Sequence, residues 1–163
     1  MPRQLSLLVL LFLLGCGREE KPAASTGSPG SDRSTLYREF SKRFGNEIVR
    51  RDFKRAWGMC SKSYQAEVNL DEFTKLFESA QIEYGRPIAI SVDENTVHAE
   101  GAAGDDLGFP VDVAPENRRA RMCVTLGTNL DGVTVTGGCD CWINIASEDG
   151  QDRIVTVELG PPD

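Results

Sequence analysis

The chain has 163 residues, of which 40% are hydrophobic and 26% are charged, and its net charge at pH 7 is −7. These ordinary proportions exclude a wholly disordered chain and a protein that crosses a membrane many times. The length fits one globular domain after an export signal and a linker are set aside. The acidic balance argues against a nucleic-acid partner.

An export signal is predicted at the start of the chain. Residues 1–4 give a short basic start, and the uncharged, leucine-rich run 5–14 follows. Ten helical residues with a rise of about 1.5 Å each span only about 15 Å, which is half of a bilayer's hydrocarbon core. We therefore interpret residues 1–15 as a signal peptide and not as a permanent transmembrane helix.

The signal ends in Leu13-Leu14-Gly15-Cys16. This tetrapeptide resembles the lipobox of bacterial lipoprotein precursors. The resemblance implies cleavage before Cys16, a diacylglycerol on its thiol and often an acyl chain such as palmitate on its new amino group. Because each buried methylene contributes about 0.8 kcal/mol, two or three acyl chains hold a protein stably at a bilayer. A plain secretory signal with an incidental cysteine is the competing interpretation.

Gly17 would be the second residue of the mature chain. By analogy with enteric bacteria, a residue other than Asp at this position directs a lipoprotein to the outer membrane, facing the periplasm. Up to Ser34 the chain consists mainly of small and polar residues with scattered charges and no apolar period. We interpret residues 16–34 as the lipidated cysteine with a flexible tether, and residues 35–160 as the folded domain.

Three helices are expected in the first half of the domain. In residues 36–51, aromatic and aliphatic side chains recur at steps of three and four, the period of one helical face. Residues 52–57 begin with an aspartate that can cap a short second helix. Asn69 stands three residues before Glu72, a capping-box pattern that predicts the start of a third helix over residues 71–79.

The second half of the domain changes to β-branched and alternating residues, which indicate strands. The expected strands are residues 87–92, 96–102, 120–126, 141–146 and 154–159. Turns are expected at residues 93–95 and 148–151, and the second turn joins the last two strands in a hairpin. Residues 127–138 fit either a loop or an extra short hairpin.

This order predicts an α+β fold, with three helices packed on one face of a curved antiparallel sheet of four to six strands. Residues 51–57, then 69–73, then 84–85 before a strand resemble the cystatin-like domains of the nuclear-transport-factor-like superfamily, which occur in small bacterial lipoproteins. The resemblance covers residues 36–159. It implies a sheet that curls around the helices to form a conical cavity, used in that superfamily for binding, for catalysis or for no known purpose.

Four cysteines remain after Cys16 is assigned to lipid: Cys60, Cys123, Cys139 and Cys141. In an oxidising compartment we expect two disulfides. A bond between Cys139 and Cys141 would close too tight a ring. Cys60 is therefore expected to pair with one of them and Cys123 with the other. A zinc site of four thiolates and a redox-active pair at Cys139 and Cys141 are the competing interpretations, although the sequence has no C-x-x-C pair.

Charge is divided unevenly along the chain. Residues 33–62 carry nine Lys or Arg and three acidic residues, whereas residues 63–163 carry six and nineteen, so their net charges are +6 and −13. A basic helical surface could face anionic membrane headgroups. The interpretation that we favour from sequence is that the basic helices pack on an acidic sheet and complement its charge inside the domain.

Candidate catalytic residues are sparse. His98, the only histidine, lies in an alternating strand and is expected to be exposed. The pair Asp105-Asp106 resembles the carboxylate base of cavity-bearing isomerases in the superfamily, but its glycine neighbours favour a polar loop. Trp57 and Trp142 could line a cavity, although packing in the core is the default for such aromatic residues.

The sequence contains no nucleophile elbow, phosphate-binding loop, zinc-protease helix or calcium loop. We therefore expect no catalytic residue, metal or cofactor, and a membrane-anchored domain that binds an envelope protein or a small ligand. The alternative is a small cavity enzyme of the isomerase or dehydratase type, which needs a titratable group in an open pocket. A third possibility is a component of an envelope assembly, which needs a large apolar patch on the free sheet face.

Overall fold

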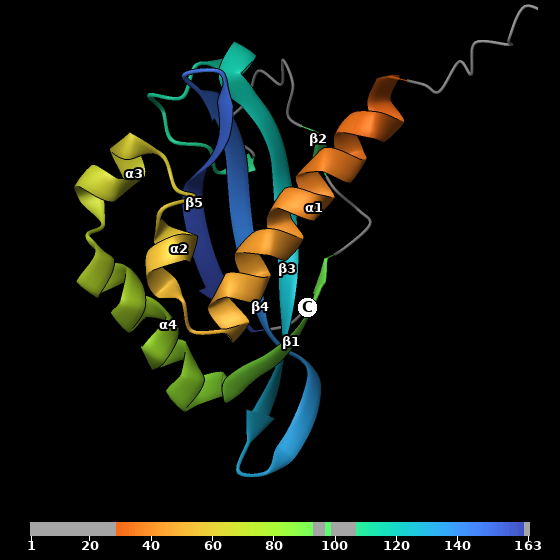
Figure 1. The fold of residues 1–163 in the computed structure, drawn as a ribbon, viewed down its shortest axis with the longest axis vertical. Coiled ribbons are helices and arrows are strands. Elements are labelled where there is room, and N and C mark those ends of the chain that lie inside the picture. Colours follow the sequence, from red (N-terminus) through yellow and green to blue (C-terminus); the bar gives the residue numbers. More distant parts are fainter. Residues whose placement is uncertain (1–28, 93–96, 99–106, 162–163) are drawn as a thin grey trace, which may run out of the picture.

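The structure is a computed structural model that describes residues 29–92, 97–98 and 107–161. The signal peptide and Cys16 lie outside these ranges. The described residues form an α+β domain in which four α-helices lie on one side of an antiparallel sheet (Figure 1). The α+β class and the antiparallel sheet that we predicted are therefore confirmed. Among the described helices, none is both long enough and apolar enough to cross a membrane.

Helix α1 (Pro29–Val49) is the longest of the helices and lies along the sheet (Figure 1). It begins before the expected residue 36, so residues 29–34, which we predicted as part of the tether, are helical. A proline suits the first position of a helix because its fixed φ matches the helix and its missing N–H would have no partner there. Apolar residues at helical spacing appear only after the first turns of α1, so this pattern placed the predicted start of the helix too late.

Two short helices follow α1. Helix α2 (Phe53–Trp57) begins at the expected cap, where the Asp52 side chain accepts a hydrogen bond from a backbone N–H of the first turn. Helix α3 (Lys62–Glu67) is capped in the same way by Ser61 and was not predicted. No residue of α3 is buried, so its sequence shows no apolar period.

Helix α4 (Leu70–Tyr84) begins with the predicted capping box. The Asn69 side chain accepts hydrogen bonds from the first turn, and the Glu72 side chain accepts from the Asn69 backbone N–H. The helix continues past the predicted end at residue 79 and buries Phe73 and Phe77. The described helices therefore number four, where we expected three.

In the described part of the chain the sheet has five strands: β1 (Arg86–Val92), β2 (Val97–His98), β3 (Arg118–Leu130), β4 (Val133–Glu148) and β5 (Gln151–Gly160). Its main order is β1-β3-β4-β5, and β2 pairs with β3. All of these pairs are antiparallel. Each strand predicted from sequence is present in whole or in part, with only residues 97–98 of the second one described.

Two Asp-Gly turns join the long strands. Asp131-Gly132 joins β3 to β4, and Asp149-Gly150 joins β4 to β5, with positive φ at all four residues. Positive φ at both central residues matches the right-handed twist of the flanking strands in a two-residue hairpin. Residues 127–138 are therefore the end of one continuous hairpin and not a loop.

Aromatic rings fill the space between the helices and the sheet. Phe44 of α1 lies 6.5 Å from Phe73 and 6.4 Å from Phe77 between ring centroids, and the two rings of α4 are 5.1 Å apart. Met122 and Ile143 line the sheet side of the same core, and both are fully buried. Burial of each such side chain contributes about 1.5–3 kcal/mol. This side of the sheet is therefore packed.

Helix α1 approaches the sheet closely at Gly45. A Cβ atom built on Gly45 would lie 2.8 Å from Cγ1 of Val124 and 3.0 Å from Cγ2 of Ile90. These distances are shorter than van der Waals contact, so only a glycine lets the backbone of the helix lie this near the sheet.

We expect Gly45→Val to lower the free energy of unfolding by about 1–3 kcal/mol, because the added side chain overpacks the contact between α1 and the sheet. Urea unfolding followed by circular dichroism measures the change. The control Asn46→Val adds the same side chain at the next, exposed position and should change the stability by less than about 0.5 kcal/mol. Equal stability of Gly45→Val and the wild type would contradict the close approach.

Candidate binding site

A cleft of about 510 Å³ is lined by residues of α2, of α3 and of the turn between β4 and β5 with its flanks. Figure 1 shows where these elements lie in the fold. The linker from α2 to α3 is fixed to β5 by two backbone hydrogen bonds. The Ser61 N–H donates to the Ile154 carbonyl at 2.8 Å, and the Ile154 N–H donates to the Met59 carbonyl at 3.1 Å. These bonds hold the two walls of the cleft in a fixed relation.

The rim of the cleft is charged. The Lys62 ammonium donates a hydrogen bond to Oδ2 of Asp149 at 2.7 Å, and both side chains are exposed. This contact lowers the pKa of the Asp149 carboxyl and raises the pKa of Lys62. The backbone N–H of Lys62 lies 3.1 Å from each carboxylate oxygen of Glu148. A ligand at this rim would therefore meet a positive ammonium group and negative carboxylates close together.

Deeper in the cleft, the polar side chains bond to the backbone. The Gln65 amide donates to the carbonyls of Trp57 at 2.9 Å and Cys60 at 3.1 Å. The Trp57 indole N–H donates to a backbone carbonyl at 2.8 Å. Arg153 donates to the Gly58 carbonyl at 3.1 Å. These bonds make the cleft walls rigid and leave the carboxylates and the ammonium at the rim as the groups most accessible to a ligand.

Cys60 lies at the base of the cleft and is buried. Burial raises the pKa of its thiol to about 12, although the nearby Arg153 acts in the opposite direction. Burial also raises the pKa of Tyr64, and the neighbouring Cys60 and Cys141 raise it further. Because only the thiolate is nucleophilic, a protonated thiol at neutral pH does not attack a substrate. The cleft can hold a ligand, and the Cys60 thiol in it is not activated as a nucleophile.

Two smaller hollows border the same turn. One, of about 350 Å³, lies beside Arg43 and Met59. The other, of about 240 Å³, lies beside Ser63 and Asn117. Both share residues of the β4–β5 turn and its flanks with the cleft. This end of the domain is therefore hollowed on several sides of one hairpin.

The register of the sheet divides the cysteines between its two faces. Cys141 pairs with Val124, whose side chain meets α1, and Cys60 packs in the same core. Cys123 pairs with Trp142 and therefore points to the other face, because successive side chains of a strand alternate. Among the described residues, no group of three His, Cys, Asp or Glu side chains is placed to hold a metal ion.

The two expected disulfides stay predictions. Cys60, Cys139 and Cys141 are thiols in this structure. Cys139 pairs with Leu126 and belongs to the helix-side core, so a bond from Cys123 to Cys139 or Cys141 would have to pass through the sheet. A bond from Cys60 to either core cysteine needs no such crossing.

The free face of the sheet carries a polar network centred on Arg121. Its guanidinium carbon lies 5.1 Å from the centre of the Trp142 ring, and it donates to Glu158 at 3.0 Å and to Asn144 at 3.3 Å. Arg121 and Asn144 both donate to the Leu107 carbonyl at 3.0 Å. The network therefore fixes the chain after residue 107 to this face and gives the face around Trp142 a polar character.

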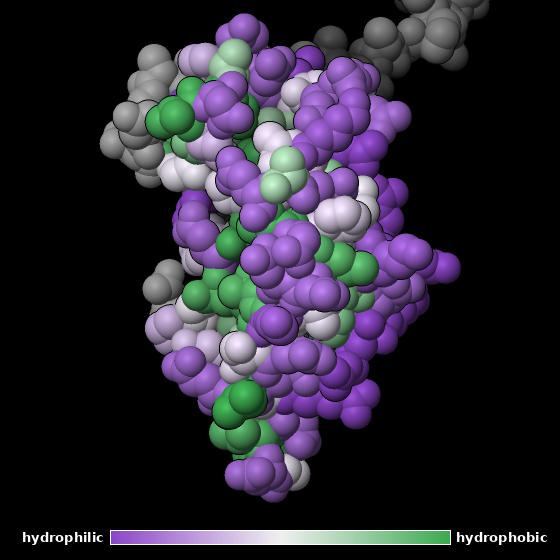
Figure 2. Space-filling model, turned by 90° about the vertical axis from the view of Figure 1, so that its left-hand side faces the viewer, coloured by the Kyte–Doolittle hydropathy of each residue, from purple (hydrophilic) through white to green (hydrophobic). Residues whose placement is uncertain are grey.

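Exposed apolar side chains gather at the end of the β3–β4 hairpin, far from the cleft. Leu130, Val133 and Val135 are 40%, 64% and 39% exposed. Figure 2 shows hydrophobic residues at this projecting end of the molecule. The pairings of β3 with β4 place these side chains on the face that the helices cover elsewhere, and they are exposed because the hairpin extends past the helices.

The remaining candidate residues from the sequence analysis lie in different parts of the domain or outside the described residues. Trp57 lines the cleft, whereas Trp142 lies on the free face of the sheet and not in the helix-side core where we expected it. The backbone of His98 pairs with Ala120. The side chain of His98 and the pair at residues 105–106 lie outside what the structure describes.

Sequence reasoning missed the charged rim of the cleft. The sequence predicts a turn at Glu148 and Asp149 but gives no sign of a binding site there. Lys62 belongs to α3, the helix that the sequence analysis does not predict. The capping serine before Lys62 was an available signal for that helix. No local pattern links Lys62 to a turn so much later in the chain.

Comparison with known proteins finds no matching family model, no similar curated protein and no similar solved structure. The candidate site therefore rests on its geometry.

We expect Cys60 in the reduced, folded protein to react with iodoacetamide at pH 8 at least about 100-fold more slowly than in denatured protein, because the reactive thiolate is scarce. Mass spectrometry of the Cys60 peptide over time measures the rate. Equal rates would contradict the burial of this thiol. Since its folded pKa of about 12 exceeds the ordinary value of 9.0, its contribution to stability is full below pH 9 and is lost as pH rises toward 12.

Proposed function

We propose that this protein is a lipoprotein of the bacterial cell envelope, held at the membrane by acyl chains on Cys16. The observation that carries the proposal is the tetrapeptide at residues 13–16 directly after the apolar run 5–14. Two or three acyl chains give stable anchoring, whereas one chain holds only marginally. Gly17 supports sorting to the outer membrane, where the domain faces the periplasm.

The same proposal assigns the domain to the cystatin-like fold of the nuclear-transport-factor-like superfamily. Its support is a long first helix lying along an antiparallel sheet, followed by short capped helices and then the remaining strands. In this assignment the interior of the cone is filled by Phe44, Phe73 and Phe77. A ligand would therefore bind at the surface and not in the interior.

The domain acts as a non-catalytic binding module whose cleft receives an envelope protein or a small polar ligand. The support is an open cleft with rigid walls and a rim that presents Lys62, Glu148 and Asp149. The protonated thiol of Cys60 and the backbone bonds of Gln65 and Arg153 favour binding over chemistry. No observation on the described residues favours the isomerase or dehydratase alternative.

We expect the protein extracted from membranes to begin at Cys16 and to carry diacylglycerol on that residue, which intact-mass and peptide mass spectrometry measure. Cys16→Ser should remove the acyl mass completely, because no thiol remains to form the thioether. The control Cys123→Ser, which also removes one thiol, should keep it. A wild-type chain with an unmodified Cys16, or one that is cleaved elsewhere, would refute the anchor.

We expect a companion protein or ligand to copurify with the native lipoprotein after mild cross-linking and to depend on the rim of the cleft. The double variant Lys62→Gln/Asp149→Asn should reduce its recovery at least about tenfold, since loss of one charged contact at a binding site costs more than 1.4 kcal/mol when it is central. Quantitative mass spectrometry measures the recovery.

The matched control for this experiment is Glu39→Gln/Lys42→Gln, which removes an equivalent exposed ion pair from α1. It should leave the recovery of the companion unchanged. Equal recovery with all three proteins would show that the cleft is not the binding site. Absence of any companion from the wild type would contradict the binding role.

A further inference from the structure

We propose that the outer side of α1 is a docking surface for the anionic phospholipid headgroups of the membrane that carries the anchor. The inference rests on the proposed acylation of Cys16 and adds to it a defined orientation of the domain. Its basis is the position, exposure and pairing of the basic side chains on this helix.

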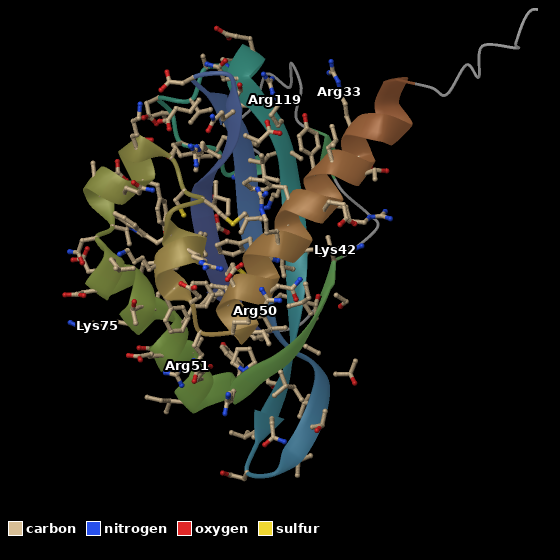
Figure 3. All side chains as sticks on the ribbon, in the orientation of Figure 1. Arg33, Lys42, Arg50, Arg51, Lys75 and Arg119 are labelled. Atoms are coloured by element: carbon tan, nitrogen blue, oxygen red, sulfur yellow. The ribbon has the colours of Figure 1, made fainter. Side chains whose placement is uncertain are left out.

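Basic side chains follow α1 along its whole length. The exposed or half-exposed ones on the helix and directly after it are Arg33, Arg38, Lys42, Arg43, Arg50 and Arg51. Figure 3 shows four of them spread from the start of the helix to its end, whereas Lys75 and Arg119 lie on α4 and at the start of β3. At about 100° per residue, Lys42, Arg43 and Arg50 lie within about 100° of one another around the helix axis, whereas Arg33 lies on the side opposite Lys42. Lys42, Arg43 and Arg50 can therefore face one flat anionic surface together.

Two of these cations, Lys42 and Arg50, form their ion pairs with residues of α1 itself. Lys42 pairs with Glu39 at 2.9 Å, and Arg50 pairs with Glu47 at 3.7 Å, both within α1. Where α1 meets the sheet at Gly45, the contact is apolar. Arg51, in contrast, pairs with Glu78 of α4 at 3.3 Å, so the internal charge complementarity that we expected is present at the end of α1. The exposed pair of Lys42 with Glu39 is weak, so it competes little with a charged surface.

Arg43 is the clearest case of an available cation. Its guanidinium carbon lies 5.3 Å from the centre of the Phe40 ring, and it forms no ion pair with any described residue. The aromatic contact holds the side chain at the surface of α1 without neutralising its charge. Arg43 can therefore meet a phosphate group without first breaking an ion pair.

The opposite sign of charge on α4 would orient the domain. Exposed carboxylates on this helix that form no ion pair with α1 or the residues directly after it are Asp71, Glu72 and Glu83, whereas Glu78 pairs with Arg51. An anionic membrane attracts α1 and repels α4. Both forces turn the domain in the same direction. The oriented domain rests with α1 toward the bilayer and α4 away from it.

The anchor keeps α1 near the membrane. Twelve residues separate Cys16 from Pro29, where α1 begins, and even a fully extended chain of this length reaches only about 40 Å. Helix α1, with 21 residues, is itself about 30 Å long. Because charge attraction decays over about 8 Å at physiological salt, the helix must lie against the headgroups to gain from it.

The test uses the native acylated lipoprotein on supported bilayers and measures the height of the domain by neutron reflectometry. One bilayer is pure phosphatidylcholine, and the other contains about 30% phosphatidylglycerol, a charge density at which each Lys or Arg near the surface strengthens docking about fivefold. We expect the wild-type domain to lie against the headgroups on the anionic bilayer only, and to lift away when the salt is raised to about 0.5 M.

The triple variant Lys42→Gln/Arg43→Gln/Arg50→Gln should weaken docking about 100-fold, because three cations leave the surface. The control Lys75→Gln/Arg86→Gln/Arg119→Gln loses the same charge from exposed or half-exposed positions outside α1 and should dock like the wild type. Thermal melting followed by circular dichroism verifies that both variants remain folded. Equal heights of the wild type on the two bilayers, or equal lifting by both triple variants, would overturn the proposal.

Flotation separates this inference from the proposal of the anchor. A protein that does not float with neutral vesicles in about 0.5 M salt, where charge attraction is screened, lacks the lipid anchor, and that result overturns both proposals. A protein that floats but keeps the same height on both bilayers retains the anchor and overturns the docking surface alone.

Discussion

The close packing of α1 against the sheet is the contact on which the rest of the domain depends. At Gly45 the helix backbone comes so near Val124 and Ile90 that a Cβ atom could not be accommodated. The rings of Phe44, Phe73 and Phe77 fill the remaining volume, which brings α4 into the same core. Because the interior is packed in this way, a ligand would have to bind at the surface of the domain.

The surface features follow from this contact. Once the apolar side of α1 is buried, its basic residues Lys42, Arg43 and Arg50 lie at the surface of the domain or near it. The fixed pairing of Ser61 with Ile154 holds α3 beside the β4–β5 turn and makes the cleft. In the two roles that we propose, one end of the domain receives a ligand while the side of α1 rests on a membrane, and the cleft and the docking surface use different residues.

Local sequence patterns predicted most of the helices and strands. They did not predict contacts between residues that are far apart in the sequence. The capping box at Asn69 and Glu72 located α4, and alternating residues located the strands, because both signals lie in a few neighbouring residues. The short helix α3 has no buried residue, so its sequence shows no apolar spacing from which it could be predicted. The pairing of Cys123 with Trp142 places this cysteine across the sheet from Cys141, which a single sequence cannot show because register is set by the whole fold.

The most direct test of the account is the contact at Gly45, observed in solution by nuclear magnetic resonance. With methyl-labelled protein, we expect nuclear Overhauser effects from the α-protons of Gly45 to methyl groups of both Val124 and Ile90, since these carbons lie within van der Waals reach. If both are seen, α1 lies on the sheet as described. If Gly45 instead shows contacts only to solvent-exposed neighbours in its own helix, the packed interior and the surface roles inferred from it are both wrong.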